Sequence, residues 1–207
     1  LLWPAARAWS LAARARLGLY QAGWLRTQRL ARPVVSVGNL SAGGTGKTPF
    51  VMWLFSELAA RGIKPAVLTR GYGREDRRET LLFTEPGTPP DAAGAGDEVQ
   101  VMLRQGVAPL GVDANRFRSG SALEAQCPVD LHILDDGFQC LALARDLDIV
   151  LLDNSRLPWN DDLLPAGRLR EPTAALRRAG VIVLTRLQDW TAVEPLIAQL
   201  RRWAPEA

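Results

Sequence analysis

The feature that most restricts the fold is a glycine-rich turn between a short apolar segment and a helical pattern. Val34–Val37 is mostly β-branched, and the turn after it ends in Gly46-Lys47-Thr48, where an apolar helical pattern begins. This order is typical of a phosphate-binding loop (P-loop), because its backbone N–H groups and the helix N-terminus form a concave anion site. In such a loop, Lys47 reaches the β- and γ-phosphates of a nucleotide and the Thr48 hydroxyl binds Mg²⁺.

We expect eight consecutive residues of this loop to bind the nucleotide. They are Ser41, Ala42, Gly43, Gly44, Thr45, Gly46, Lys47 and Thr48. The usual pattern opens with glycine, and here that position is Ser41. A glycine-rich turn with a chance Gly-Lys-Thr is the alternative, and the strand before and the helix after favour the nucleotide loop.

The rest of the chain alternates strand and helix patterns, which predicts an α/β fold with a P-loop NTPase-like parallel sheet flanked by helices. The strand candidates are apolar on both faces, as in a sheet that is covered on both sides. They are Val34–Val37, Ala66–Thr69, Val107–Val112, Leu131–Asp135, Asp148–Leu152 and Val181–Thr185. The helix candidates are Lys47–Arg61, Asp97–Gln105, Asn115–Gln126, Thr173–Ala179 and Ala192–Trp203. Two long irregular stretches, 70–96 and 153–172, are candidates for functional loops.

An N-terminal amphipathic helix is predicted over residues 1 to about 30, where apolar residues recur every three or four positions. Residues 1–32 hold six arginines and no acidic residue, although the net charge of the 207-residue chain is only +3. This asymmetry indicates an anionic partner, either membrane or nucleic acid. No 18-residue uncharged run is present, so we expect an interfacial helix or one packed on the domain rather than a transmembrane span. The predicted units are residues 1–32 and a lobe over residues 33–207.

Two adjacent carboxylates follow a predicted strand, in a pattern that resembles a Walker B strand. The segment Leu131–Asp135 is apolar and delivers Asp135 and Asp136 to the carboxyl edge of the sheet. Mg²⁺ is held by one or two carboxylates together with waters and phosphate oxygens. Side chains of an extended chain alternate between faces, so we expect one carboxylate to bind metal while the other orients a loop or a second ligand.

Asp97 opens a predicted helix after a loop rich in glycine, alanine and proline. On the residues alone, an N-cap role is favoured over a role as general base that takes a proton from an attacking hydroxyl. His132 lies inside an apolar strand and is expected to be a core residue.

Six arginines lie in or beside the predicted rim loops, and two or three of them are expected to bind phosphate. They are Arg70, Arg74, Arg116, Arg118, Arg168 and Arg170. In the long loop before Arg168, Trp159 and Leu163-Leu164-Pro165 either line an acyl or sugar pocket or pack beneath the loop.

Five further motifs, in order, accompany the P-loop and together resemble the tetraacyldisaccharide 4′-kinases, the lipid A 4′-kinases. They are Arg70-Gly71-Tyr72-Gly73, Gly96-Asp97-Glu98, Asp135-Asp136-Gly137-Phe138-Gln139, Arg145-Asp146 and Leu164–Pro172. The match spans nearly all of the chain. The P-loop of that family also lacks the first glycine, which accounts for Ser41.

The resemblance implies an ATP- and Mg²⁺-dependent kinase bound peripherally to the cytoplasmic face of the inner membrane of a Gram-negative bacterium. It would phosphorylate the 4′-hydroxyl of an acylated disaccharide 1-phosphate to give lipid IVA, with residues 1–32 on the anionic membrane surface and no nucleic-acid partner. By resemblance, Asp97 is the catalytic base, Lys47 and Asp136 are catalytic, and Thr48 and Asp135 hold the metal. By the same resemblance, the residues that contact the substrate or a phosphate are Arg70, Arg116, Arg170 and Glu171.

Two departures from the family pattern affect these expectations. Cys140 stands where the family usually has histidine after the Asp-Asp-Gly-Phe-Gln run. Family members also continue well past residue 207 into a lobe that carries a histidine paired with the base, so this chain is expected to be the nucleotide-binding lobe alone. The alternatives are a soluble P-loop ligase or NTPase of the biotin or cobalamin type, and a nucleotide-binding fragment without catalytic activity.

Overall fold

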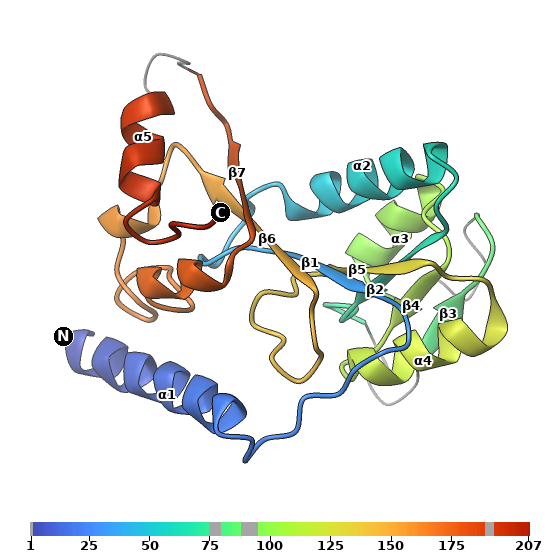
Figure 1. Ribbon diagram of the computed structural model, residues 1–207, viewed down its shortest axis with the longest axis horizontal. Helices are drawn as coiled ribbons and strands as arrows, with labels where there is room; N and C mark the ends of the chain where they lie inside the picture. The colour runs from blue at the N-terminus through green and yellow to red at the C-terminus, as the bar shows by residue number, and fades with distance from the viewer. Residues whose placement is uncertain (1, 75–79, 88–94, 189–192) are drawn as a thin grey trace.

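The computed structural model describes residues 2–74, 80–87, 95–188 and 193–207, and these contain a seven-stranded sheet (Figure 1). The strand order is β3-β4-β2-β5-β1-β6-β7, and only the β3–β4 pair is antiparallel. The strands are β1 (Val34–Gly38), β2 (Pro65–Thr69), β3 (Leu81–Phe83), β4 (Leu110–Val112), β5 (Leu131–Asp135), β6 (Leu147–Asp153) and β7 (Val181–Thr185). The predicted α/β class and parallel sheet are confirmed.

Helices cover both faces of this sheet. The helices of the described residues are α1 (Trp3–Gln21), α2 (Lys47–Ala60), α3 (Asp97–Arg104), α4 (Arg116–Gln126) and α5 (Val193–Leu200), with 3₁₀ helices η2 (Pro158–Asn160) and η3 (Thr173–Arg178). Figure 1 shows α2 and α3 on one side of the sheet and α4 on the other. Because right-handed β–α–β crossovers place helices on the sheet faces, the strands are shielded from water on both sides.

Strand β2 illustrates how the sheet divides the core. Its Val67 packs in the cluster under α2 and α3, whereas Ala66 and Leu68 pack in the cluster under α4. All three side chains are fully buried. This alternation follows from the two-residue period of a strand, and it explains why the strands are apolar throughout rather than at every second position.

A third cluster joins the end of β6 to the C-terminal elements. Leu40 and Phe138 pack there with Leu176 of η3 and with Leu196 and Leu200 of α5. The half-buried side chains at 159 and 163 also pack against this cluster. For Trp159 and Leu163, the structure therefore favours packing beneath the loop over lining an acyl or sugar pocket.

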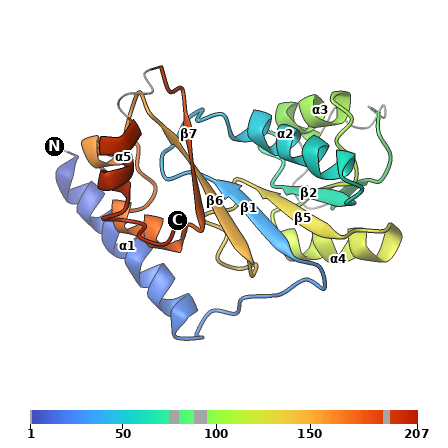
Figure 2. The same cartoon turned by 45° about the horizontal axis from the view of Figure 1, so that its top comes forward.

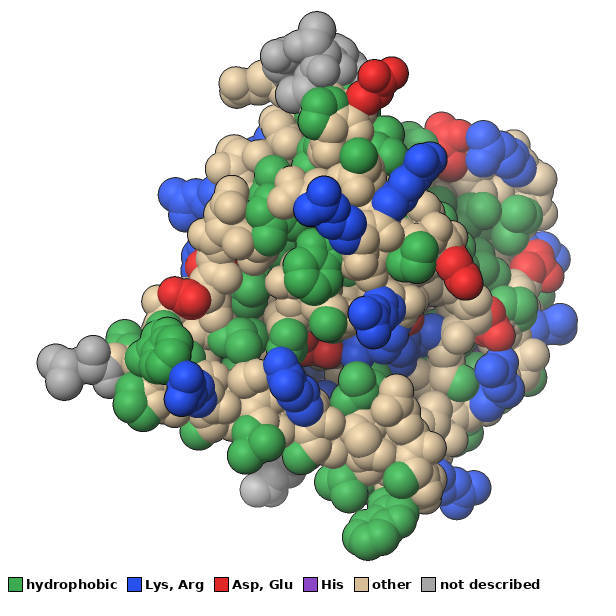
Figure 3. All heavy atoms as spheres, turned by 60° about the vertical axis from the view of Figure 1, so that its left-hand side comes forward, with side chains coloured by type: hydrophobic (Ala, Val, Ile, Leu, Met, Phe, Trp, Pro, Cys, Tyr) green, Lys and Arg blue, Asp and Glu red, His purple; other side chains and the backbone are tan. Residues whose placement is uncertain are grey.

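Helix α1 lies outside the sheet layers and is shorter than the predicted segment of about 30 residues. It ends at Gln21, and the chain turns at Gly23, whose φ of 76° is accessible to glycine. Ala6 is its one buried residue among those described. Figure 2 shows α1 beside the C-terminal elements, and Figure 3 shows hydrophobic and basic side chains interspersed on that side of the molecule. None of the described helices combines the length and hydropathy that a membrane span requires.

The structure differs from the sequence prediction at several element boundaries. The strand predicted from Val107 starts at Leu110, because Pro109 has no N–H to give to the ladder. The segment predicted as a helix at residues 173–179 is the 3₁₀ helix η3, and β3 was not predicted. Position 192, the predicted start of the last helix, lies outside the described residues.

The topology brings the carboxyl ends of the central strands together. Strand β1 lies between β5 and β6, and the chain leaves it toward β2 on one side while β6 leads to β7 on the other. Ligands of open α/β sheets bind at such a change in strand order. The loop after β1 is therefore at the position where the fold favours a ligand.

The close approach of two strand ends at Gly38 gives a test of the fold. A Cβ atom at Gly38 would lie 2.6 Å from the Cβ of Phe138 and 2.7 Å from its backbone N. We expect Gly38→Ala to lower the free energy of unfolding by about 2 kcal/mol, measured by urea denaturation. Gly18→Ala is the control, because nothing lies within 4 Å of a Cβ there and alanine favours a helix. Equal effects of the two substitutions would contradict this packing.

Candidate nucleotide-binding site

A cavity of about 510 Å³ lies at the carboxyl edge of the sheet. Six segments that are far apart in the sequence contribute to its lining: the P-loop, the loop after β2, the start of α3, the end of β5, and the segments around residues 170 and 186. The lining residues are Gly43, Gly44, Thr45, Gly46, Lys47, Thr48, Pro49, Tyr72, Glu98, Asp135, Asp136, Arg170 and Arg186. The cavity thus combines the predicted P-loop with both predicted carboxylates.

Asn39 holds the P-loop in shape from beneath. Its buried side chain donates from Nδ2 to Thr45 Oγ1 at 2.9 Å and accepts from Lys47 Nζ at 3.3 Å. Gly46, which precedes α2, has a φ of 85° that disfavours other residues. Asn39 was not among the predicted site residues, and its signal in the sequence is an amide directly after an apolar strand.

Ser41 and Ala42 belong to the P-loop but lie away from the cavity. The N–H of Ala42 donates to the carbonyl of Arg168 at 2.7 Å, and Ser41 forms a β-bridge with Leu169. The N–H of Arg170 in turn donates to Leu40 O at 2.8 Å. The first residues of the loop therefore anchor the segment that carries Arg170, which explains why glycine is not required at position 41.

Asp136 joins two cations across the cavity. Its carboxylate oxygens lie 3.5 Å from Lys47 Nζ and 2.7 Å from Arg170 Nη1. Burial raises the pKa of Asp136, but the charges of Lys47 and Arg170 outweigh burial and hold the pKa below its ordinary value. The expectation that the two aspartates face opposite ways is wrong, because Asp136 has a φ of 48° and both side chains line one cavity.

Asp135 has the opposite electrostatic environment. It is almost fully buried and accepts one hydrogen bond from Thr69 Oγ1 to Oδ2, at 3.2 Å. Its buried Oδ1 has no hydrogen-bond partner within the described part of the chain. Burial raises the pKa of Asp135 to about 6, and the charges of Glu98 and Asp136 add to the increase.

Arg186 closes the other side of the P-loop and was not predicted from the sequence. It follows β7, has a φ of 56°, and donates to Asp153 Oδ2 at 2.7 Å and to Gly44 O at 3.1 Å. The neighbouring Thr185 hydroxyl donates to Thr45 O at 3.2 Å. The end of β7 is therefore bonded directly to the P-loop backbone.

The six predicted rim arginines divide into two groups. The first group is at or near the cavity: Arg170 lines it, the buried Arg116 lies within electrostatic reach of both aspartates, and the exposed Arg70 lies within electrostatic reach of Arg116. Burial lowers the pKa of Arg116. The other three form structural contacts. Arg74 donates to Val112 O, Arg118 pairs with Asp113, and Arg168 pairs with Asp161.

The predicted N-cap role of Asp97 is wrong. Gly96 is the N-cap residue of α3, and Asp97 is the first helical residue. Asp97 is exposed, and its neighbour Glu98 lines the cavity. Glu171 is likewise turned away, because its buried carboxylate pairs with Arg178 at 2.9 Å. As expected, His132 is a core residue, with Nε2 3.0 Å from a glutamate oxygen.

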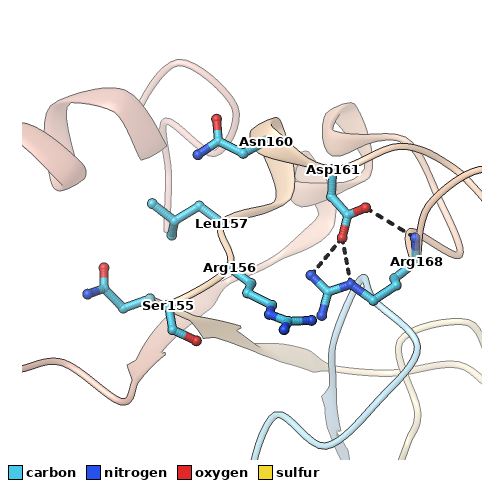
Figure 4. Close-up of a pocket in the computed structure, with 7 residues that line it drawn as sticks. Ser155, Arg156, Leu157, Asn160, Asp161 and Arg168 are labelled. Carbon is cyan, nitrogen blue, oxygen red and sulfur yellow. Dashed lines mark hydrogen bonds and ion pairs between the residues drawn. The ribbon is translucent and has the colours of Figure 1, made fainter.

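A second, more polar cavity of about 360 Å³ lies beside the segment that precedes Leu169 (Figure 4). Its lining residues are Asn154, Ser155, Arg156, Leu157, Asn160, Asp161 and Arg168. Asp161 accepts from Arg168 Nε at 2.8 Å and from the Arg168 N–H at 3.2 Å. This ion pair shapes the loop next to the P-loop, and no P-loop residue lines the cavity.

Comparisons with known proteins agree with this site. Residues 1–203 match the family model described as LpxK, tetraacyldisaccharide-1-P 4′-kinase. The tetraacyldisaccharide 4′-kinase of Aeromonas salmonicida is 40% identical over 88% of this chain and 54% of the relative. That of Geobacter sulfurreducens is 45% identical over 86% of this chain and 51% of the relative. The chain thus spans about half the length of these curated relatives.

A solved structure supports the same relationship. A crystal structure of LpxK from Aquifex aeolicus, described as an "apo" form in complex with ATP, matches with a TM-score of 0.81 and 38% sequence identity. The match covers 94% of this chain and 59% of that one. The architecture around the cavity is therefore similar to that of a protein whose structure was determined with ATP.

The raised pKa of Asp135 predicts a pH-dependent effect on stability. A carboxyl with a folded-state pKa of about 6, above the ordinary 3.8, favours unfolding fully above pH 6, and this effect is lost as the pH falls from about 6 to 3.8. Without metal or nucleotide, Asp135→Asn should therefore raise the free energy of unfolding at pH 7.5 by on the order of 2 kcal/mol. The gain should shrink toward about pH 4, as measured by urea denaturation at both pH values.

Asp153→Asn is the control with the opposite sign. Burial raises the pKa of Asp153, but hydrogen bonds from Ser155 and the charge of Arg186 outweigh it and leave the pKa lowered. Its removal should destabilise the protein at pH 7.5. A gain from Asp135→Asn that is equal at both pH values would contradict the assigned cause.

Proposed function

Because the chain belongs to the tetraacyldisaccharide-1-P 4′-kinase family, we propose that it is the nucleotide-binding lobe of a kinase for an acylated disaccharide lipid. The reaction transfers the γ-phosphoryl group of ATP to the 4′-hydroxyl of a tetraacyldisaccharide 1-phosphate and gives lipid IVA. The observation that carries this proposal is the meeting of the P-loop, Asp135, Asp136 and Arg170 in one cavity. In-line transfer of this kind depends mainly on positioning and charge neutralisation.

The triphosphate binds along the P-loop. Backbone N–H groups of residues 43–48 surround the β- and γ-phosphates, and the positive end of α2 adds to their field. Lys47 is catalytic in this proposal, because its ammonium neutralises charge that develops on the transferred phosphoryl oxygens. Arg170 lies across the cavity from Lys47 and contacts the phosphates from the other side.

Mg²⁺ fits the oxygen ligands at the end of β5. The buried Oδ1 of Asp135 lacks a hydrogen-bond partner among the described residues, and Thr48 lines the same cavity. No cluster of three or more metal-binding side chains occurs in the described ranges, which agrees with Mg²⁺ held by one carboxylate, waters and phosphate oxygens. When bound, the ion neutralises phosphate charge, while Asp136 keeps Lys47 and Arg170 oriented.

The general base remains assigned to Asp97, with Glu98 as its competitor. Asp97 matches the family motif and lies at the N-terminus of α3, whereas Glu98 lines the cavity. A carboxylate that accepts the proton of the 4′-hydroxyl must reach that oxygen once the lipid is bound. The motif favours Asp97 and the cavity lining favours Glu98, so comparing the two substitutions decides between them.

The N-terminal unit, residues 1–32, is proposed to bind the anionic cytoplasmic surface of the inner membrane, while residues 33–207 form the kinase lobe. Exposed hydrophobic residues on or next to α1 are Leu2, Trp3, Trp9, Leu11, Leu19, Trp24 and Leu25. They alternate with arginines, as in helices that lie in the membrane interface (Figure 3). No nucleic-acid partner is proposed.

Substitution of Lys47 tests the proposed activity. In the full-length protein, Lys47→Ala should lower ATP-dependent phosphorylation of the disaccharide by about 100-fold or more, since it removes a donor to the transferred group. Transfer of ³²P from labelled ATP to the lipid measures this rate. The other lysine of the chain, Lys64, is exposed and supplies the control Lys64→Ala. Normal turnover in Lys47→Ala would contradict the proposal.

Paired substitutions test the base. Asp97→Asn should lower kcat by about 10²–10⁴-fold, the usual contribution of a general base, with the loss visible across the pH profile. Glu98→Gln should mainly change the dependence on Mg²⁺ and ATP, because Glu98 lies beside Asp135. If the large loss of kcat occurs in Glu98→Gln instead, the base is Glu98.

Vesicle binding tests the membrane proposal. The full-length protein should sediment with vesicles that contain phosphatidylglycerol, less so with neutral phosphatidylcholine vesicles, and less as salt is added. Deletion of residues 1–32 should abolish this sedimentation. Equal binding to both vesicle types would contradict a role for the N-terminal arginines.

A further inference from the structure

Helix α1 contacts two loops of the nucleotide site directly. The indole Nε1–H of Trp9 donates to the carbonyl of Arg170 at 2.9 Å, and Arg16 Nη1 donates to the carbonyl of Gln139 at 3.1 Å. Figures 1 and 2 both show α1 alongside the segment that contains η3, which follows Arg170. An element with one described buried residue therefore forms two specific hydrogen bonds to the kinase lobe.

The first contact fixes Arg170 from a second side. Its N–H is bonded to Leu40 O at 2.8 Å, its carbonyl accepts from Trp9, and its guanidinium pairs with Asp136 at 2.7 Å. Asp136 also pairs with Lys47. The Trp9 indole is therefore connected, through Arg170, to Asp136 and Lys47 in the cavity.

The second contact reaches the P-loop itself. Gln139, whose carbonyl accepts from Arg16, donates from Nε2 to Asn39 O at 3.0 Å. The Asn39 side chain bonds to Thr45 and Lys47. Two hydrogen-bond paths thus run from α1 toward Lys47, and they are linked where Arg170 Nη1 donates to Gln139 Oε1 at 3.4 Å.

We propose that Trp9 and Arg16 are positioning residues for the nucleotide site, and that docking of α1 stabilises the ATP-binding arrangement of Arg170, Asp136 and the P-loop. The inference rests on the proposed nucleotide site. An α1 that docks part of the time lowers the fraction of molecules competent to bind, and the apparent Kd for ATP rises in proportion. By reciprocity, ATP strengthens the docking of α1.

The arginine pair on α1 provides a matched test. Arg14 and Arg16 are both exposed, but Arg14 forms no hydrogen bond or ion pair with the part of the chain that the structure describes. In the full-length protein without lipid, Arg16→Gln should raise the Kd for Mg·ATP about threefold to fivefold, at unchanged Tm. This is the change in binding expected from the loss of about one hydrogen bond. Arg14→Gln removes the same charge and should leave the Kd unchanged. Arg16→Lys keeps a cationic donor and should restore part of the affinity.

A tryptophan pair tests the other path. Trp9→Phe keeps an aromatic ring but removes the N–H that Arg170 O accepts, so it should also weaken Mg·ATP binding about threefold. The control is Trp53→Phe, because Trp53 is 55% exposed on α2 and its recorded ring contact is with Phe50. Isothermal titration calorimetry on all variants gives the Kd values.

Two results would overturn the inference. Wild-type affinity in both Arg16→Gln and Trp9→Phe means that the two contacts do not position the site, and an equal loss in Arg14→Gln means that charge rather than contact matters. Lys47→Ala separates this outcome from failure of the proposed function. If Lys47→Ala still binds Mg·ATP normally, the nucleotide site itself is misassigned, whereas a loss confined to Lys47→Ala refutes only the role of α1.

Discussion

The ion pairs of Asp136 with Lys47 and Arg170 are the interaction on which the arrangement of the site depends. They connect three segments that the sheet brings together only at its carboxyl edge: the P-loop, the end of β5 and the loop that precedes η3. Asp136 can reach both cations because the chain leaves β5 in a left-handed conformation, which turns its side chain into the cavity beside Asp135. Its lowered pKa keeps Asp136 charged, so its carboxylate attracts both cations.

The pKa values of the neighbouring Asp135 and Asp136 are shifted in opposite directions, which indicates different roles for the two carboxylates. Asp136 pairs with two cations and has a lowered pKa, whereas Asp135 is almost fully buried and has a raised pKa. The Oδ1 atom of each carboxylate has no hydrogen-bond partner among the described residues, and only that of Asp136 lies in an ion pair. A dication would stabilise the charged form of Asp135 and complete its coordination. When the environments of two adjacent carboxylates push their pKa values apart, the two groups commonly have different roles.

Local patterns predict the fold well and the site in part. Apolar strands, a glycine-rich turn and helical periodicity are short-range signals, so the sheet, the P-loop and the Asp135-Asp136 pair follow from the sequence. The partners of these residues do not. Glu98 and Arg186 reach the cavity, and Asn39 reaches the P-loop, through strand order and through turns with unusual φ. Neither property is encoded within a few residues. The same limitation explains why Glu171, predicted to contact the substrate beside Arg170, instead pairs with Arg178.

Helix α1 extends this network from the kinase lobe to the surface proposed to meet the membrane. The central claim is that the triphosphate lies between Lys47 and Arg170, and a crystal structure with Mg²⁺ and a non-hydrolysable ATP analogue tests it most directly. The account predicts β- and γ-phosphate oxygens within hydrogen-bond distance of Lys47 Nζ and of backbone N–H groups of residues 43–48, with the ion on Asp135. A nucleotide seated in the cavity between Ser155 and Arg168, with Lys47 still bound only to protein, would contradict it.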